Sequence, residues 1–133
     1  MIIQKGPYRL ALSKRLLGII QGEVEKAGVE CDGGIAVIFR DPDYSMTRGS
    51  YHPVEIGIDA KGRITHITDF SYVGSPPYAE LVKEIDFDLA QAAFQHMGRE
   101  FHIDKGRGLF RTWQKNFCDY HGWGVFQVEV TPL

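Results

Sequence analysis

The stretch from Ile35 to Gly74 carries the densest β-strand signal in the chain and most constrains its fold. It begins with the apolar run Ile35–Phe39, bounded by two glycines and an Asp-Pro pair, as expected of a short buried strand. Residues 52–59 then alternate between polar and apolar side chains. Because Asp59-Ala-Lys-Gly62 has the residues of a three-residue hairpin turn, a strand over 63–73 is predicted to pair with them. The sequence therefore predicts a sheet on which the flanking segments pack.

The hairpin turn also predicts the register of these two strands. It places Asp59 opposite Arg63, and alternation then puts one set of side chains on a shared apolar surface. The predicted pairs on that surface are Ile58 with Ile64, Ile56 with His66, Val54 with Thr68 and His52 with Phe70. The opposite surface is predicted to carry Glu55, Gly57, Thr65, Ile67 and Asp69.

Two flanking segments have helical periodicity. From Ser13, a good N-cap, to about Ala27, apolar residues recur every three or four positions, and Gly28 is a natural stop. The segment from Leu109 to about Tyr120 carries a stripe of four aromatic residues, which we interpret as part of the core. These two helices are predicted to cover the apolar face of the sheet.

The remaining segments complete the predicted architecture. Strands are predicted over 83–87 and 125–130, with Phe126, Val128 and Val130 on one face of the latter. Residues 79–84 would equally suit one helical turn, so strand and helix are alternatives for the segment 78–88. Asp88 followed by Gln91 resembles a capping box, so a third helix is predicted from Asp88 to about Met97, followed by a polar loop over 98–108. The predicted fold class is α+β, with a mainly antiparallel, twisted sheet of about five strands covered by N-terminal and C-terminal helices.

Composition limits the classes of partner. A chain of 133 residues is expected to form a single domain over 1–133, and 15 basic against 17 acidic side chains argue against nucleic-acid and membrane surfaces. The longest apolar run near the N-terminus is too short to span a bilayer, and no cleavage site follows it. Cys31 and Cys118 match no metal or redox spacing and are interpreted as plain thiols, with a structural disulfide as the alternative. We expect a cytoplasmic protein.

The loop between Arg40 and Pro53 is long for a connection between strands and concentrates charged and aromatic residues. The extended hairpin register places Tyr72 opposite Ser50, beside the end of this loop. Alternatively, Asp41 and Asp43 only cap the turn through hydrogen bonds to the backbone. The predicted binding surface consists of Arg40, Asp43, Tyr44, Arg48, Tyr51, His52 and Tyr72.

The five histidines form no ligand motif, and the chain has no nucleophile elbow. In the predicted register, however, His52 and His66 share one face, two ladder steps apart. The leading hypothesis is a non-enzymatic protein-binding module with no cofactor. The alternative is a small enzyme or metal-binding protein that uses His52, His66 and nearby carboxylates.

Several ordered motifs resemble a known family. They are Phe39-Arg-Asp-Pro-Asp-Tyr-Ser45, Tyr51-His-Pro-Val-Glu-Ile56, Ile67-Thr-Asp-Phe-Ser-Tyr-Val-Gly74, Glu84-Ile-Asp-Phe-Asp88 and Trp113-Gln-Lys-Asn-Phe-Cys118. Together they resemble DUF2787, a bacterial domain-of-unknown-function family with members on pathogenicity islands and other mobile elements. The resemblance implies the fold of the mitochondrial acidic matrix proteins, in which terminal helices cover a twisted antiparallel sheet. Those proteins bind other proteins, including complement, as ring-shaped oligomers.

Two strands are predicted to be sheet edges, which either carry protective charges or pair with a partner strand. Glu84, Asp86 and Asp88 would protect the strand over 83–87. The C-terminal strand is less protected, so a homodimer is expected in addition to an unidentified protein partner.

Overall fold

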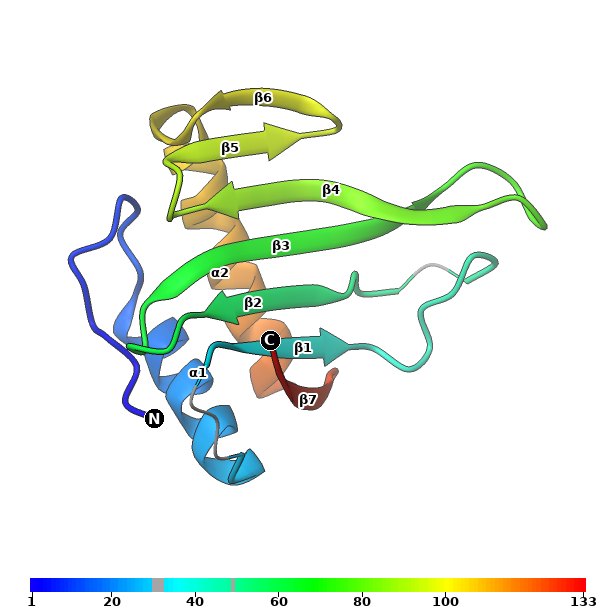
Figure 1. Cartoon of the computed structure of the whole chain (residues 1–133). Helices are drawn as coiled ribbons and strands as arrows, with labels where there is room; N and C mark the ends of the chain where they lie inside the picture. Colours follow the sequence, from blue (N-terminus) through cyan, green and yellow to red (C-terminus); the bar gives the residue numbers. More distant parts are fainter. Residues whose placement is uncertain (30–32, 49) are drawn as a thin grey trace.

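The computed structural model describes residues 1–29, 33–48 and 50–133. Its elements follow the chain in the order α1 (Lys14–Ala27), β1 (Ile35–Arg40), β2 (Val54–Ile58), β3 (Ile64–Val73), β4 (Glu80–Asp88), β5 (Ala93–His96), β6 (Arg99–His102), η1 (Ile103–Gly106), α2 (Arg107–Gly122) and β7 (Gln127–Pro132). In the described part of the chain, the strands form one seven-stranded sheet in the order β6-β5-β4-β3-β2-β1-β7 (Figure 1). Every neighbouring pair is antiparallel. The α+β class is confirmed, but the sheet is larger than the five strands predicted.

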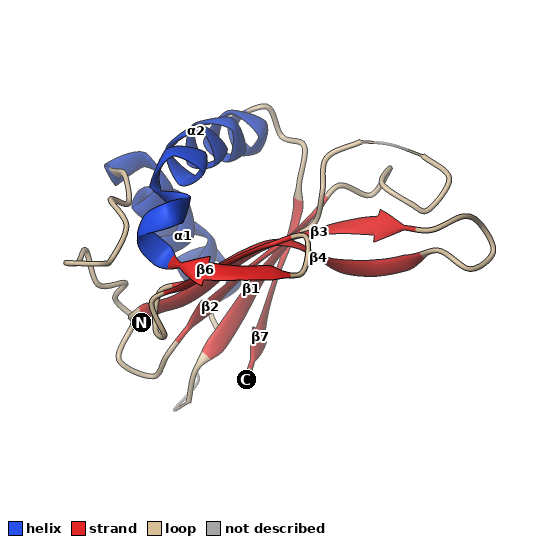
Figure 2. Ribbon diagram, turned by 90° about the horizontal axis from the view of Figure 1, so that it is seen from above, coloured by secondary structure: helices blue, strands red, loops and turns tan. Residues whose placement is uncertain are grey.

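Both α-helices lie on one face of the sheet, and among the described residues the other face carries no helix (Figure 2). The ends of α1 follow the local sequence signals. Ser13 Oγ accepts a hydrogen bond from the backbone N–H of Leu16, and Gly28 ends the helix in the left-handed conformation, as predicted. Within the described residues, neither helix has the length and apolar character needed to cross a membrane.

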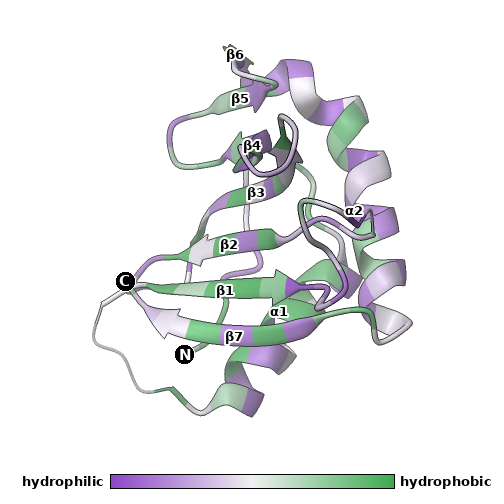
Figure 3. Cartoon of the chain, turned by 90° about the vertical axis from the view of Figure 1, so that its right-hand side faces the viewer, coloured by the Kyte–Doolittle hydropathy of each residue, from purple (hydrophilic) through white to green (hydrophobic). Residues whose placement is uncertain are grey.

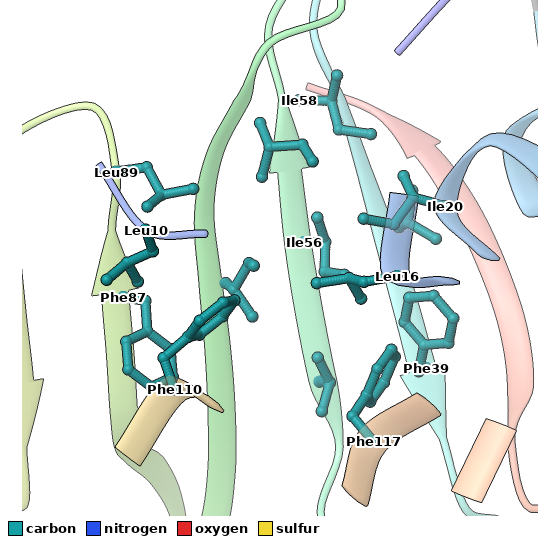
Figure 4. Packing of buried hydrophobic residues seen from close by; sticks show 14 of the residues in the cluster. Leu10, Leu16, Ile20, Phe39, Ile56, Ile58, Phe87, Leu89, Phe110 and Phe117 are labelled. Atoms are coloured by element: carbon teal, nitrogen blue, oxygen red, sulfur yellow. The ribbon is translucent and has the colours of Figure 1, made fainter. Parts of the chain in front are cut away.

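The core lies between the helices and the sheet (Figure 4). Its fully buried side chains include Leu16 and Ile20 of α1, Phe39 of β1 and Phe117 of α2. The predicted aromatic face of α2 is confirmed as core for three of its four residues, because Phe110 and Phe117 are buried and Trp113 packs against the same cluster, whereas Tyr120 lines a pocket. The Trp113 and Phe117 rings stack with centroids 5.0 Å apart. Such pairs stabilise a core beyond the area they bury.

The last strand, β7, pairs with β1 and runs at the opposite end of the sheet from β5 and β6 (Figure 3). Phe126, Val128 and Val130 pack against the core, as predicted. Cys118 is a buried thiol, and burial raises its pKa. The prediction of a plain thiol is confirmed for Cys118. Cys31 lies outside the described residues.

The predicted hairpin register holds only beside the turn. The Asp59 N–H donates to the Arg63 carbonyl, and Ile58 pairs with Ile64. A bulge at Thr65 then shifts the register by one residue. The observed partners are Gly57 with His66, Ile56 with Ile67, Glu55 with Thr68 and Val54 with Asp69.

The bulge corrects which residues face the core. Ile67 was predicted on the outer surface but is fully buried opposite Ile56. His66 was predicted on the apolar surface but lies on the outer one, where its ring covers Gly57 and leaves no space for a Cβ atom there. An extra residue in one strand reverses the alternation beyond it, and here the exchange buries isoleucine in place of histidine.

The predicted helix from Asp88 to Met97 is wrong. The chain turns at residues 89–92, where the N–H groups of Leu89 and Ala90 both donate to the Thr65 carbonyl, and then forms β5. The Gln91 N–H does bond to Asp88 Oδ1, but this contact belongs to a turn. Pairing of Phe94 with Phe87 of β4 outweighs the helical preference of the local sequence, and their rings stack 5.5 Å apart.

The same hairpin corrects the predicted edges of the sheet. Residues 98–108, predicted as a polar loop, contain β6, η1 and the first two residues of α2. Because β5 and β6 extend the sheet, β4 lies inside it, and β6 forms the edge instead. The prediction that the C-terminal strand is an edge is confirmed for β7.

Candidate functional site

A histidine and two carboxylates meet on the helix-covered side of the sheet. His52 lies in the loop before β2, Asp69 in β3 and Glu84 in β4. His52 Nδ1 lies 2.8 Å from Asp69 Oδ1 and 3.1 Å from Glu84 Oε2. We call these three residues the His52 cluster.

A second β-bulge brings Glu84 into the cluster. In the β3–β4 ladder, Asp69 pairs with Ile85 and Phe70 pairs with Lys83, so Glu84 is the extra residue. Strict alternation would place Glu84 on the face opposite to buried Ile85. Both residues instead line the same pocket. Bulges often redirect a side chain in this way beside functional sites.

The indole of Trp113 holds Asp69 from α2. Trp113 Nε1–H donates to Asp69 Oδ2 at 3.0 Å, whereas the other carboxylate oxygen faces His52. Only 12% of the Asp69 side chain is exposed, so this charge depends on its hydrogen bonds more than a surface carboxylate would. The cluster therefore ties the long loop to both the sheet and α2.

Beside the cluster lies a half-open pocket of about 300 Å³. One side is polar and consists of the His52 cluster. The walls are mainly aromatic and come from the loop, α2 and the segment before β7; they include Tyr51, Trp113, Phe117, Tyr120 and Phe126. Tyr51 and Tyr120 meet with ring centroids 4.4 Å apart. A concave, largely apolar site with a few converging polar groups is typical of a ligand-binding site.

The two carboxylates of the cluster raise the pKa of His52. The hydrogen bond to Asp69 is the main cause that raises the pKa of His52, and the Glu84 carboxylate adds to it, while partial burial opposes both. The imidazolium form is favoured because the two acidic groups stabilise its charge.

Tyr44 connects the cluster to the rest of the long loop. Its ring lies 5.4 Å from the His52 ring and 5.4 Å from the Tyr72 ring, measured between centroids. Its hydroxyl oxygen accepts a hydrogen bond from the Tyr72 N–H at 2.9 Å. Asp41, which is almost fully buried, accepts hydrogen bonds from the Asp43 and Tyr51 N–H groups and so shapes the turn.

The structure places the residues of the predicted binding surface in different surroundings. Tyr44, His52 and Tyr72 are adjacent, but Tyr51 turns toward α2. Arg40 lies 3.8 Å from Glu129 of β7. Asp43 and Arg48 are exposed in the loop. The structure therefore brings Tyr44 beside Tyr72 and His52, whereas Tyr51 packs against Tyr120 of α2.

The predicted pairing of His52 with His66 is also wrong. His66 Nε2 lies 2.9 Å from Glu55 Oε2 on the helix-free face, whereas His52 lies on the helix-covered face. Asp69 was predicted on the surface opposite to His52, and neither Glu84 nor Trp113 was predicted to belong to a site. The charge alternation over 83–88 carries no sign of the bulge that redirects Glu84.

Comparisons with known proteins agree with this fold. The sequence model of a family of proteins of unknown function, DUF2787, matches residues 12–131. The conserved hypothetical protein VC1805 from pathogenicity island VPI-2 of Vibrio cholerae, described as structurally homologous to the human P32 protein, is 29% identical with a TM-score of 0.81. The hypothetical protein VC0508 from the VSP-II pathogenicity island of Vibrio cholerae is 28% identical with the same TM-score.

Both similarities cover 95% of this chain and 98% of the other chain. No curated protein matches the sequence. Because the family model spans nearly all of the sequence and the resemblance noted in its motifs is confirmed, the chain belongs to DUF2787.

Proposed function

We propose that this protein is a non-enzymatic protein-binding module that binds its partner at the far end of the β3–β4 hairpin. Residues 70–83 of this hairpin, here called the arm, extend past the rest of the sheet beside the long loop (Figures 1 and 2). The observation that carries the proposal is the exposure of large hydrophobic side chains there. Tyr78 is 85% exposed and Leu81 46% exposed, with Val73 also exposed on the arm and Met46 on the long loop.

Such a concentration of exposed apolar groups on a projecting element favours a protein partner. Burying a large apolar side chain contributes about 1.5–3 kcal/mol, so covering these side chains would supply much of a binding energy. Tyrosine is enriched at the energetic centres of interfaces. The arm thus offers anchors at a point that another protein can reach.

The arm is also held in place before a partner arrives. The hydrogen bond between Tyr72 N–H and Tyr44 Oη fixes its base against the long loop. Pro76 and Pro77 restrict the backbone at its tip because proline fixes the φ angle. A rigid element loses less conformational entropy on binding than a flexible one.

The test compares two matched pairs of substitutions. Tyr78→Ser with Leu81→Ser removes the anchors of the arm, and Ile2→Ser with Leu133→Ser removes two exposed apolar groups that lie outside the arm. Affinity capture from the native cell, quantified by mass spectrometry, should recover a protein with the wild type and the control but lose it with the arm variant. All three should keep the same melting temperature, since exposed substitutions usually change stability by no more than about 0.5 kcal/mol each. Equal capture by both variants would refute the proposed surface.

A further inference from the structure

We propose that the His52 cluster binds one divalent transition-metal ion through His52 Nδ1, Asp69 Oδ1 and Glu84 Oε2. These three potential ligand atoms come from three different elements and lie within 4.8 Å of one another. Among the described residues, it is the one group of three histidine, cysteine or acidic side chains placed closely enough to share a metal ion. The proposal concerns the pocket beneath the long loop and is independent of the protein-binding arm.

The distances fit ligands that share one ion. With metal–ligand bonds of about 2.1 Å and right angles between them, neighbouring ligand atoms lie about 3 Å apart. The Nδ1 atom of His52 is 2.8 Å and 3.1 Å from the two carboxylate oxygens. An ion placed among these atoms therefore needs only small side-chain movements, and it would take the position of the proton that His52 now shares with the acids.

The ligands are held by further contacts outside the cluster. Trp113 Nε1–H bonds to the Asp69 oxygen that does not face His52, so Asp69 Oδ1 stays directed at the site. The Tyr44 ring packs beside the imidazole and restricts its plane. Hydrogen bonds and packing of this kind orient the ligands of protein metal sites and strengthen their affinity.

The donor set indicates the class of ion. Two carboxylates and a neutral imidazole carry two negative charges, which a divalent cation balances. Nitrogen from imidazole suits Mn²⁺, Fe²⁺, Co²⁺ or Zn²⁺ better than Mg²⁺ or Ca²⁺, which prefer oxygen ligands alone. The pocket of about 300 Å³ beside the cluster leaves room for water at the remaining coordination positions.

A second histidine–carboxylate pair, on the other face of the sheet, serves as the control. His66 Nε2 lies 2.9 Å from Glu55 Oε2, a histidine–carboxylate pair with similar exposure to the His52 cluster but without a second carboxylate in the same group. Glu55→Gln therefore makes the same chemical change as Glu84→Gln and alters the net charge by the same amount. Comparing the two variants distinguishes metal binding at the His52 cluster from weak, non-specific binding of cations at any histidine–carboxylate pair.

The experiment uses full-length protein without a tag, stripped with EDTA and dialysed. Calorimetric titration with MnCl₂ and ZnCl₂, and electron paramagnetic resonance of Mn²⁺, should show one ion per chain. Glu84→Gln should weaken the affinity by at least about tenfold, because losses of this size follow removal of even outer-shell partners. Glu55→Gln should leave the affinity unchanged, and His52→Ala provides a second cluster variant if Glu84→Gln does not fold by circular dichroism.

The outcomes separate the two proposals. Absence of binding at millimolar metal, or equal affinity of the Glu84→Gln and Glu55→Gln variants, would overturn the metal site and leave the cluster as a charge network that joins the loop to the sheet. Neither result bears on the arm, because the arm variants leave all three ligands intact. Conversely, loss of partner capture by the arm variant with metal binding unchanged would support the protein-binding surface alone.

Discussion

Replacing Trp113 by Phe tests whether the indole of α2 holds the Asp69 carboxylate. The substitution keeps an aromatic ring against Phe117 but removes the Nε1–H that lies 3.0 Å from Asp69 Oδ2. A hydrogen bond to a charged group contributes about 1.5–3 kcal/mol, and Asp69 is too buried for water to replace the donor freely. We therefore expect a loss of about 2 kcal/mol in the free energy of unfolding.

The expected change in melting temperature follows from chain length. The entropy of unfolding is about 2.1 cal/mol/K per residue, or about 0.28 kcal/mol/K for 133 residues. A loss of about 2 kcal/mol then lowers the melting temperature by about 7 °C. The control is Trp123→Phe, because Trp123 is 68% exposed and the same change there should cost no more than about 0.5 kcal/mol.

The smaller ring of Phe also loses packing, so the hydrogen bond is isolated by a double-mutant cycle with Asp69→Ala. Urea unfolding followed by circular dichroism gives the four free energies. Packing losses common to both backgrounds cancel, and the coupling energy should be about 1.5–3 kcal/mol. A coupling energy below about 0.5 kcal/mol would refute the reasoning that Trp113 stabilises the cluster through Asp69.

Two further predictions concern pH and assembly. In metal-free protein, the raised pKa of His52 means that the folded state binds this proton more tightly than the unfolded state. The resulting stability should be fully present below the ordinary histidine pKa of 6.5 and lost as pH rises through the pKa of His52 in the folded state. The midpoints of urea unfolding, measured against pH, should show this loss in the wild type but not in His52→Gln. Equal pH profiles of the two proteins would contradict the prediction. The open edge of β7 is proposed to pair with a second copy, so light scattering should give twice the 15.0 kDa monomer mass at micromolar concentration, whereas a monomer at every concentration tested would exclude the dimer.

Short-range patterns in the sequence were sufficient to predict much of the fold. The limits of α1 depend on Ser13 and Gly28, which act on backbone groups one turn away or less. The aromatic face of α2 follows from helical spacing, and the turn at Asp59–Gly62 follows from residues that suit its backbone. Each of these signals lies within a few residues of its effect, so the sequence alone determined them.

The candidate site depended on contacts that only the tertiary structure decides. Whether residues 93–96 form a helix or a strand was settled by pairing with β4, where Phe94 packs on Phe87. The bulge at Thr65 separates His66 from His52, and the bulge at Glu84 brings a second carboxylate to His52. A bulge forms where the partner strand and the buried surface favour an extra residue, and both lie outside the strand that carries the bulge. Alternation read from one strand cannot show where it is interrupted, so the sequence predicted the sheet but placed His66 and Asp69 on the wrong faces.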